Sequence, residues 1–228
     1  EGIEKIIEFC NEKNLILLED AAQGLGSKYK NGNPVGSISL ASSISFSMPK
    51  IITTGQGGVV LTNDDFFNER LRKYRDFGRL KSGNDIHSSI GLNFKYTDLQ
   101  AVLGISQLSQ MEERIKKKKK MYKLYKDNIN SNYIKLLPNP ENTAPWFFEI
   151  ETPFRKDLIS YLYENGIGSR VMYPPINEQD ALIEYIQEDR SFPISKKIGL
   201  DGLWLPSSFH LSDDQILFII RKLNQFTP

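Results

Sequence analysis

One apolar stretch of the chain ends in a lysine and is followed at once by a cluster of glycines, in the segment SFSMPKIITTGQGG at residues 45–58. Lys50 stands five positions after Ser45, and three glycines occupy positions 55–58. Lysine is rarely buried unless it is paired or used in chemistry, and clustered glycines let a backbone approach another group closely. The segment therefore combines a candidate reactive amine with candidate donors for an anion.

A second group of polar side chains, Asp20 and Gln23, follows the apolar run at residues 15–18. Short continuous apolar runs are typical of buried parallel strands. In open α/β sheets, ligands bind beyond the carboxyl ends of the strands. Because the runs before Asp20 and Lys50 read as successive strands, we expect these two side chains to converge at one edge of a sheet.

A carboxylate, an amine, a hydroxyl and glycines at such an edge are what a pyridoxal phosphate (PLP) site requires. Lys50 would form an imine with the aldehyde, and Asp20 would keep the pyridine nitrogen protonated so that the ring accepts electrons. The Ser45 hydroxyl and the glycine amides can bind phosphate. The residues alone predict imine chemistry of the PLP type, without a particular reaction or substrate.

Each candidate also has a structural interpretation. Lys50 could be a surface lysine, and Asp20 could cap a loop through its own side chain. Gln23 and Ser45 could satisfy neighbouring backbone groups. Asn93, in the segment GLNFKYTD, could be an ordinary turn residue. His87 and His210 lack the spacing of metal ligands, so no metal site is predicted.

The elements that must position these residues indicate an α/β protein of two parts. Strands are expected at 15–19, 41–47 and 58–62, in a mainly parallel sheet, and a helix at 64–77 capped by residue 62 or 63. Thr97 and Gln100 form a capping box, which predicts a long helix to about residue 128.

Mixed strands and helices after that long helix predict a small α+β domain. The expected division is 1–130 for the later part of a large cofactor-binding domain, including the helix, and 131–228 for the small domain. The chain has no initiating Met and opens directly into an amphipathic helix pattern. We therefore expect that an upstream part of the large domain is missing.

Composition limits the classes of partner. The formal net charge is +1 over 228 residues, which gives no overall electrostatic case for nucleic acid or a membrane surface. The lysine run at 116–120 would spread around a helix, so it predicts a solvated face. No apolar run approaches the roughly 20 residues that cross a bilayer. Cys10, the single cysteine, and the absence of a secretory pattern favour a cytoplasmic location.

Three motifs in order resemble the DegT/DnrJ/EryC1/StrS family of sugar aminotransferases: EDAAQGLGS, SFSMPKIITTGQGGVVLTND and GLNFKYTDLQAVLGISQL. The resemblance covers essentially the whole chain and implies a fold-type-I PLP enzyme. It assigns Asp20 to the pyridine nitrogen, Gln23 to the phenolic oxygen and Ser45 to the phosphate. It assigns Lys50 to the imine and the proton shift, and Asn93 to the cofactor phosphate of the neighbouring subunit.

The resemblance also implies an activity. The enzyme would transfer an amino group, from glutamate, to a nucleotide-linked 4-keto-6-deoxy sugar, and it would work as a homodimer with shared active sites. A dehydrating branch of the family has His at the lysine position, so Lys50 favours amino transfer. The segments SRVMYPP and GLWLPSS resemble the perosamine synthases, which use a GDP-linked sugar.

Two other classes of function remain as alternatives. A non-catalytic regulator or sensor with the same fold is one, and the presence of both Asp20 and Lys50 argues against it. A nucleic-acid-binding protein that uses the lysine run is the other, and the near-zero net charge argues against that.

Overall fold

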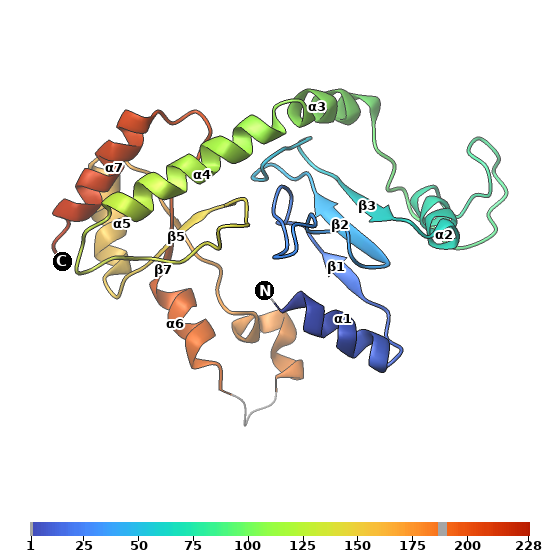
Figure 1. Ribbon diagram of the computed structural model, residues 1–228, viewed down its shortest axis with the longest axis horizontal. Coiled ribbons are helices and arrows are strands. Elements are labelled where there is room, and N and C mark those ends of the chain that lie inside the picture. The colour runs from blue at the N-terminus through green and yellow to red at the C-terminus, as the bar shows by residue number, and fades with distance from the viewer. Residues whose placement is uncertain (1, 187–190) are drawn as a thin grey trace. The chain divides into compact units, whose positions relative to one another are not determined.

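The computed structural model describes residues 2–186 and 191–228 and divides into two compact units (Figure 1). Unit 1 comprises residues 1–115 and 141–144, and unit 2 comprises residues 116–140 and 145–228. Helix α4 (Met111–Asn128) carries the boundary between them. The predicted functional division at residue 130 stays a prediction.

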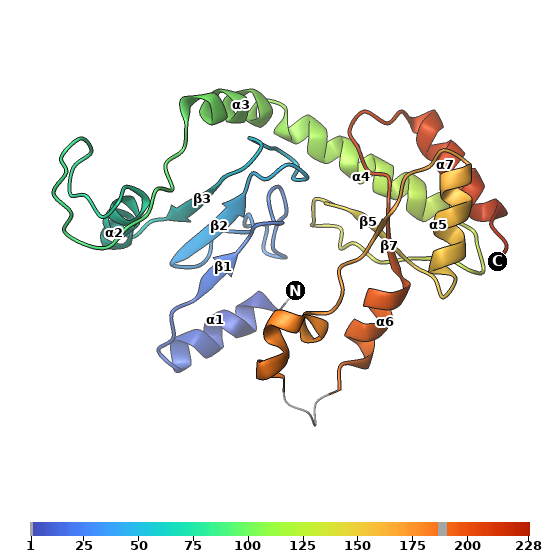
Figure 2. The same ribbon diagram turned by 180° about the vertical axis from the view of Figure 1, so that it is seen from behind.

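Unit 1 holds a three-stranded sheet in the order β1-β2-β3, visible from both sides in Figures 1 and 2. β1 and β2 pair in parallel, whereas β3 returns antiparallel to β2 after the glycine cluster. Parallel pairing in these strands is thus limited to the pair that carries Asp20 and Ser45. The elements of this unit are α1 (Ile3–Glu12), β1 (Leu18–Asp20), β2 (Ala41–Ser45), β3 (Gly58–Thr62), α2 (Asp65–Arg75) and α3 (Asp98–Leu108).

Unit 2 contains a four-stranded sheet in the order β4-β5-β7-β6, and all three strand pairings in it are antiparallel. The unit also contains helices, as predicted for an α+β domain. Its elements after α4 are β4 (Lys135–Leu136), β5 (Phe148–Glu151), α5 (Arg155–Glu164), β6 (Arg170–Val171), the short 3-10 helices η1 (Ile176–Glu178) and η2 (Asp180–Tyr185), α6 (Pro193–Asp201), β7 (Gly202–Leu205) and α7 (Asp213–Gln225).

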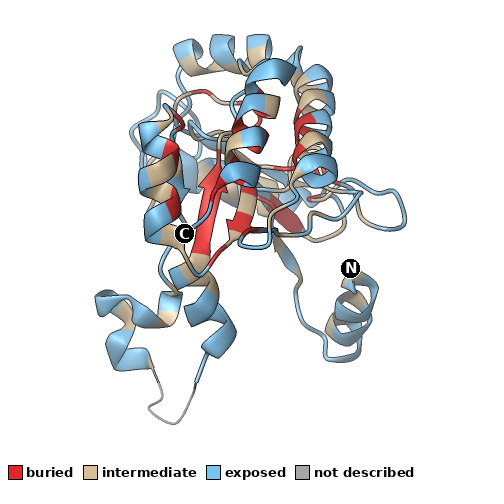
Figure 3. Cartoon of the chain, turned by 90° about the vertical axis from the view of Figure 1, so that its left-hand side faces the viewer, coloured by how far each residue is buried: buried red, intermediate tan, exposed pale blue. Residues whose placement is uncertain are grey.

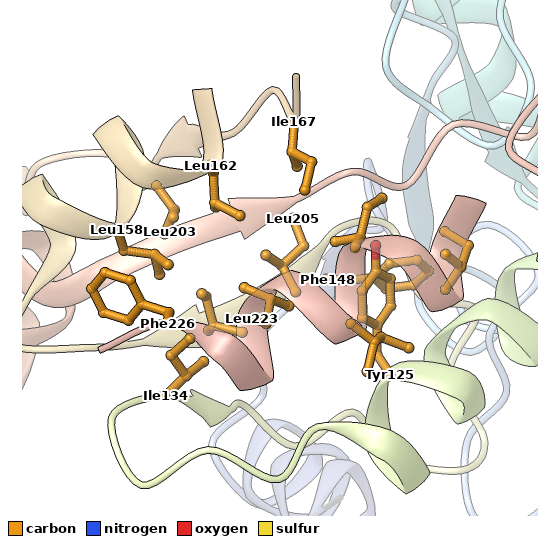
Figure 4. Close-up of a cluster of buried hydrophobic side chains, with 14 of the residues drawn as sticks. Tyr125, Ile134, Phe148, Leu158, Leu162, Ile167, Leu203, Leu205, Leu223 and Phe226 are labelled. Carbon is orange, nitrogen blue, oxygen red and sulfur yellow. The ribbon is translucent and has the colours of Figure 1, made fainter. Parts of the chain in front are cut away.

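A cluster of buried apolar side chains lies in unit 2, where helices α4, α5 and α7 pack on the sheet (Figure 4). Phe148, Leu158, Leu203 and Leu223 are fully buried in it. Each such side chain contributes about 1.5–3 kcal/mol on burial. Figure 3 shows the buried residues on strands and on the inner sides of helices, whereas α1 has none along its described length. In the parts of the chain that the structure describes, no helix has the length and apolar character needed to cross a membrane.

The predicted single helix from residue 98 to about 128 is wrong, because the chain breaks between α3 and α4. Ser109 caps α3, and its hydroxyl donates to the Ser106 carbonyl at 2.8 Å. Serine competes with the backbone in this way and weakens a helix interior. The predicted capping box of Thr97 with Gln100 is confirmed, and Ser212 with Gln215 forms a second one at the start of α7. The cap of α2 is Asp64 rather than residue 62 or 63.

The prediction that the lysine run forms a solvated face is wrong at Lys118, because this residue is only 5% exposed. Its Nζ donates to the carbonyl oxygens of Trp146, at 2.9 Å, and Ser207, at 2.6 Å. Residues three and four apart share a helix face, so Lys118 lies on the same side of α4 as Met121 and Tyr125, which enter the core. The middle lysine of the run is therefore part of the packing of unit 2.

Candidate active site

Asp20 is the last residue of β1, and the parallel register places it opposite Ser43 on β2. Its Oδ1 accepts hydrogen bonds from the Ala22 N–H at 3.1 Å and from the Ser43 hydroxyl at 3.4 Å. Because the rest of the side chain is exposed, the carboxylate remains accessible at the carboxyl edge of the sheet. This is the edge at which an open α/β sheet binds its ligands.

Ser45 ends β2, and Lys50 lies in the turn beyond it. Ser45 Oγ accepts from the Ser47 N–H at 3.3 Å, and the Lys50 N–H donates to the Ser47 carbonyl at 3.1 Å. Burial lowers the pKa of Lys50, while the charge of Asp20 acts in the opposite direction. The two ionisable groups therefore lie within electrostatic reach of one another, as the convergence of the strand ends predicts.

The glycine cluster owes its composition to backbone geometry. Gly57 has φ +126°, a conformation that disfavours any residue with a Cβ. A Cβ on Gly58 would lie 2.6 Å from the carbonyl oxygen of Ile44. The glycines thus allow the start of β3 to pack closely against the end of β2, and this packing holds Ser45 in place.

Gln23 and Asn93 occupy separate positions in unit 1. Gln23 is exposed in the turn that follows Asp20. Asn93 lies on another segment, where its backbone pairs with Asp76, and its Oδ1 accepts from the Lys95 N–H at 3.4 Å. The structure therefore brings together Asp20, Ser45 and Lys50, with Gln23 near Asp20 in sequence. The assignment of Asn93 to a neighbouring subunit's site stays a prediction.

Sequence reasoning missed Glu19, the residue before Asp20. Its carboxylate accepts three backbone N–H groups, from Gly36 at 2.8 Å, Ile38 at 3.1 Å and Ser39 at 3.2 Å. The Tyr29 hydroxyl and the Ser39 hydroxyl donate to it as well. Glu19 thereby fastens the segment that leads into β2. The available signal was a charged residue inside an apolar strand, which must be paired when it is partly buried.

The residues that meet at this edge fit the chemistry of PLP. A carboxylate held by Ala22 and Ser43 can pair with a ring nitrogen, and an amine with a lowered pKa can react with an aldehyde. Ser45 pairs across the sheet with Gly58, the last glycine of the cluster, and its hydroxyl is of a kind that can donate to a phosphate.

The chain belongs to the DegT/DnrJ/EryC1/StrS aminotransferase family, whose model matches residues 2–224. It is 32% identical over 229 residues to GDP-perosamine synthase of Escherichia coli O157:H7, a match that covers 98% of this chain and 62% of that protein. The predicted family is confirmed.

Solved structures extend the likeness to the fold. PseC of Helicobacter pylori, an aminotransferase involved in pseudoaminic acid biosynthesis, superposes with a TM-score of 0.87 at 26% identity, over 98% of this chain and 62% of that one. DesV of S. venezuelae superposes with a TM-score of 0.90 at 26% identity, over 99% and 61%. The predicted α/β, fold-type-I class is confirmed, and the chain spans about three fifths of the length of these relatives.

Proposed function

We propose that this chain is part of a PLP-dependent aminotransferase that moves an amino group from glutamate to a nucleotide-linked 4-keto-6-deoxy sugar. The observation that carries the proposal is the placement of Asp20 and Lys50 at adjacent strand ends within electrostatic reach. When bound, PLP supplies an electrophilic aldehyde and a ring that accepts electrons.

Asp20 and Lys50 would hold and move the protons of the reaction. Asp20 keeps a proton on the ring nitrogen, and the bonds from Ala22 and Ser43 fix one of its oxygens so that the other can face the ring. Lys50 Nζ would act as the base that takes a proton from the donor's α-carbon, and then as the acid that gives this proton up again. Burial lowers the pKa of Lys50, which raises the fraction of the neutral amine that acts as a base.

The remaining residues would bind and orient the cofactor. Ser45 Oγ donates to the phosphate, and the Gln23 amide donates to the phenolic oxygen. Asn93 donates its NH₂ group to the phosphate of the partner's cofactor without adding charge. These assignments rest on the family motifs and on the accessible positions of Gln23 and Asn93.

A homodimer in the cytoplasm is part of the proposal. One face of α3 supports an interface, because Leu99, Val102 and Leu103 lie three or four residues apart on it and are 82%, 65% and 53% exposed. Contiguous exposed apolar residues of this kind mark surfaces that another protein surface covers. The single cysteine, Cys10, fits a reducing compartment.

The substrate assignment is supported by the name of the E. coli relative and by the SRVMYPP and GLWLPSS segments. The test is a panel of GDP-, UDP- and dTDP-linked 4-keto-6-deoxy sugars, incubated with the holoenzyme and ¹⁵N-glutamate and analysed by mass spectrometry. We expect ¹⁵N incorporation with the GDP-linked sugar. PLP binding without ¹⁵N incorporation on any sugar would instead favour the regulator or sensor with the same fold.

A further inference from the structure

The segment that presents Asn93 is fastened to the end of helix α2. The residues on either side of Asn93 donate their backbone N–H groups to the carbonyl oxygens of Tyr74, at 2.8 Å, and Arg75, at 3.0 Å, in the last turn of that helix. Asp76, the residue that ends α2, lies directly opposite Asn93 in an antiparallel bridge. The backbone of Asn93 is thus set by the helix end, and Asp76 is its immediate neighbour.

The Asp76 carboxylate is in an unfavourable place by itself. Its side chain is only 11% exposed, and it stands at the negative end of the α2 dipole. Two cations compensate: Lys95 Nζ lies 3.1 Å from Oδ1, and an Arg79 nitrogen lies 3.5 Å from the same oxygen. The contact with the Lys95 ammonium, joined by the charge of Arg79, holds the pKa of Asp76 below its ordinary value although burial acts against it.

Lys95 links Asp76 to Asn93 through two different groups. Its ammonium pairs with the Asp76 carboxylate, and its backbone N–H donates to Asn93 Oδ1 at 3.4 Å. The ion pair therefore fixes the residue that in turn holds the side-chain oxygen of Asn93. With that oxygen engaged inside its own segment, the NH₂ end of the amide is the end available to an external acceptor.

We propose that Asp76 is a positioning residue for Asn93: its ion pair with Lys95 holds the Asn93 amide in the orientation that donates to a phosphate. This inference rests on the proposed role of Asn93 in cofactor binding. It assigns a role in cofactor binding to a residue, Asp76, that acts only through Lys95 and Asn93.

The test is the dissociation constant of PLP, measured by fluorescence titration of the apoenzyme, for wild type, Asn93→Ala, Asp76→Asn and the double variant. We expect Asn93→Ala to weaken binding by about fivefold, the equivalent of about 1 kcal/mol. Asp76→Asn should weaken it by a smaller factor of about threefold. In the Asn93→Ala background, Asp76→Asn should change the constant no further, because the group that it positions is gone.

Asp85→Asn is the matched control. It removes the same charge from the same cluster, since Asp85 pairs with Arg79 at 2.6 Å, but its side chain is 81% exposed and it stands apart from the bridge to Asn93. Its PLP affinity should equal that of wild type. If Asp76→Asn does not fold, Lys95→Met removes the same ion pair from the more exposed side and should give the same threefold loss.

The outcomes separate the inference from the function on which it rests. If Asn93→Ala binds PLP like wild type, the role of Asn93 is wrong and the inference falls with it. A second outcome would overturn only the positioning role of Asp76. In it, Asn93→Ala weakens PLP binding, but Asp76→Asn and Lys95→Met either leave PLP binding unchanged or weaken it equally in the wild-type and Asn93→Ala backgrounds. The role of Asn93 would then stand.

Discussion

Replacing Glu19 by Gln should destabilise the protein through the segment that leads into β2. The carboxylate accepts five hydrogen bonds, two on Oε1 and three on Oε2. Glutamine retains one acceptor oxygen and turns an NH₂ group toward the donors of the other. If the oxygen stays with Tyr29 and Gly36, the donors of Ile38 and Ser39 lose their acceptor.

The magnitude follows from those lost bonds. A hydrogen bond to a charged group contributes about 1.5–3 kcal/mol, and this site is only partly buried, so water can replace some of the loss. We expect Glu19→Gln to lower the free energy of unfolding by about 2 kcal/mol at pH 7. Urea unfolding followed by circular dichroism measures it, and Glu12→Gln, an exposed change of the same kind on α1, should have no effect.

The effect should depend on pH with a defined sign. Burial acts to raise the pKa of Glu19, but the hydrogen bonds from Tyr29, Gly36, Ser39 and Ile38 outweigh it and leave the pKa below 4.5. A carboxyl group whose pKa is lower in the folded protein than in the unfolded chain stabilises the fold fully at pH values above its unfolded-chain pKa. That stabilisation is lost as the pH falls through its pKa in the folded protein. The gap between wild type and Glu19→Gln should therefore close below about pH 4.5. A gap that is absent at pH 7, or unchanged at pH 3, would refute the reasoning.

Three further predictions concern the site and the core. Asp20→Asn should cripple amino transfer while the melting temperature stays within a few degrees of wild type, because an amide cannot hold the ring proton by charge; strong unfolding with activity kept per folded molecule would make Asp20 structural. At PLP concentrations below the wild-type dissociation constant, mixing Lys50→Ala with Asn93→Ala subunits should raise activity above the mean of the two parents, because each mixed dimer has one site without a lesion; demonstrated exchange with no rise above that mean would place Asn93 in its own subunit's site or away from the cofactor. Burial lowers the pKa of Lys118 to about 8 from 10.5, so between these pH values the unfolded chain binds more protons than the folded protein. The free energy of unfolding of wild type, measured with urea, should therefore rise as the pH is raised from about 8 to 10.5, and that of Lys118→Met should lack this rise.

Much of the site could be predicted because the signals are local. An apolar run followed by a polar cluster marks a strand end, and two such runs in succession were enough to expect Asp20 and Lys50 together. Capping boxes depend on two side chains three residues apart, so Thr97 with Gln100 was readable from the sequence.

The features that sequence missed depend on long-range partners. Glu19 is fixed by donors at positions 29–39, and nothing within its own strand indicates them. Lys118 receives its acceptors from residues 146 and 207, so its burial follows from the packing of α4 rather than from the lysine run. The antiparallel return of β3 likewise follows from the tight loop through Gly57 and Gly58, which an apolar run alone does not specify.

The central claim is that Lys50 is the residue that links to PLP. The direct measurement is borohydride reduction of the PLP-loaded enzyme, followed by proteolysis and mass spectrometry of the modified peptide. We expect a single stable phosphopyridoxyl adduct on Lys50, in the peptide that contains SMPK, together with loss of the absorbance band near 400 nm that is expected of the linked cofactor. An adduct on another lysine, or complete PLP loading with Lys50 unmodified after reduction, would contradict it.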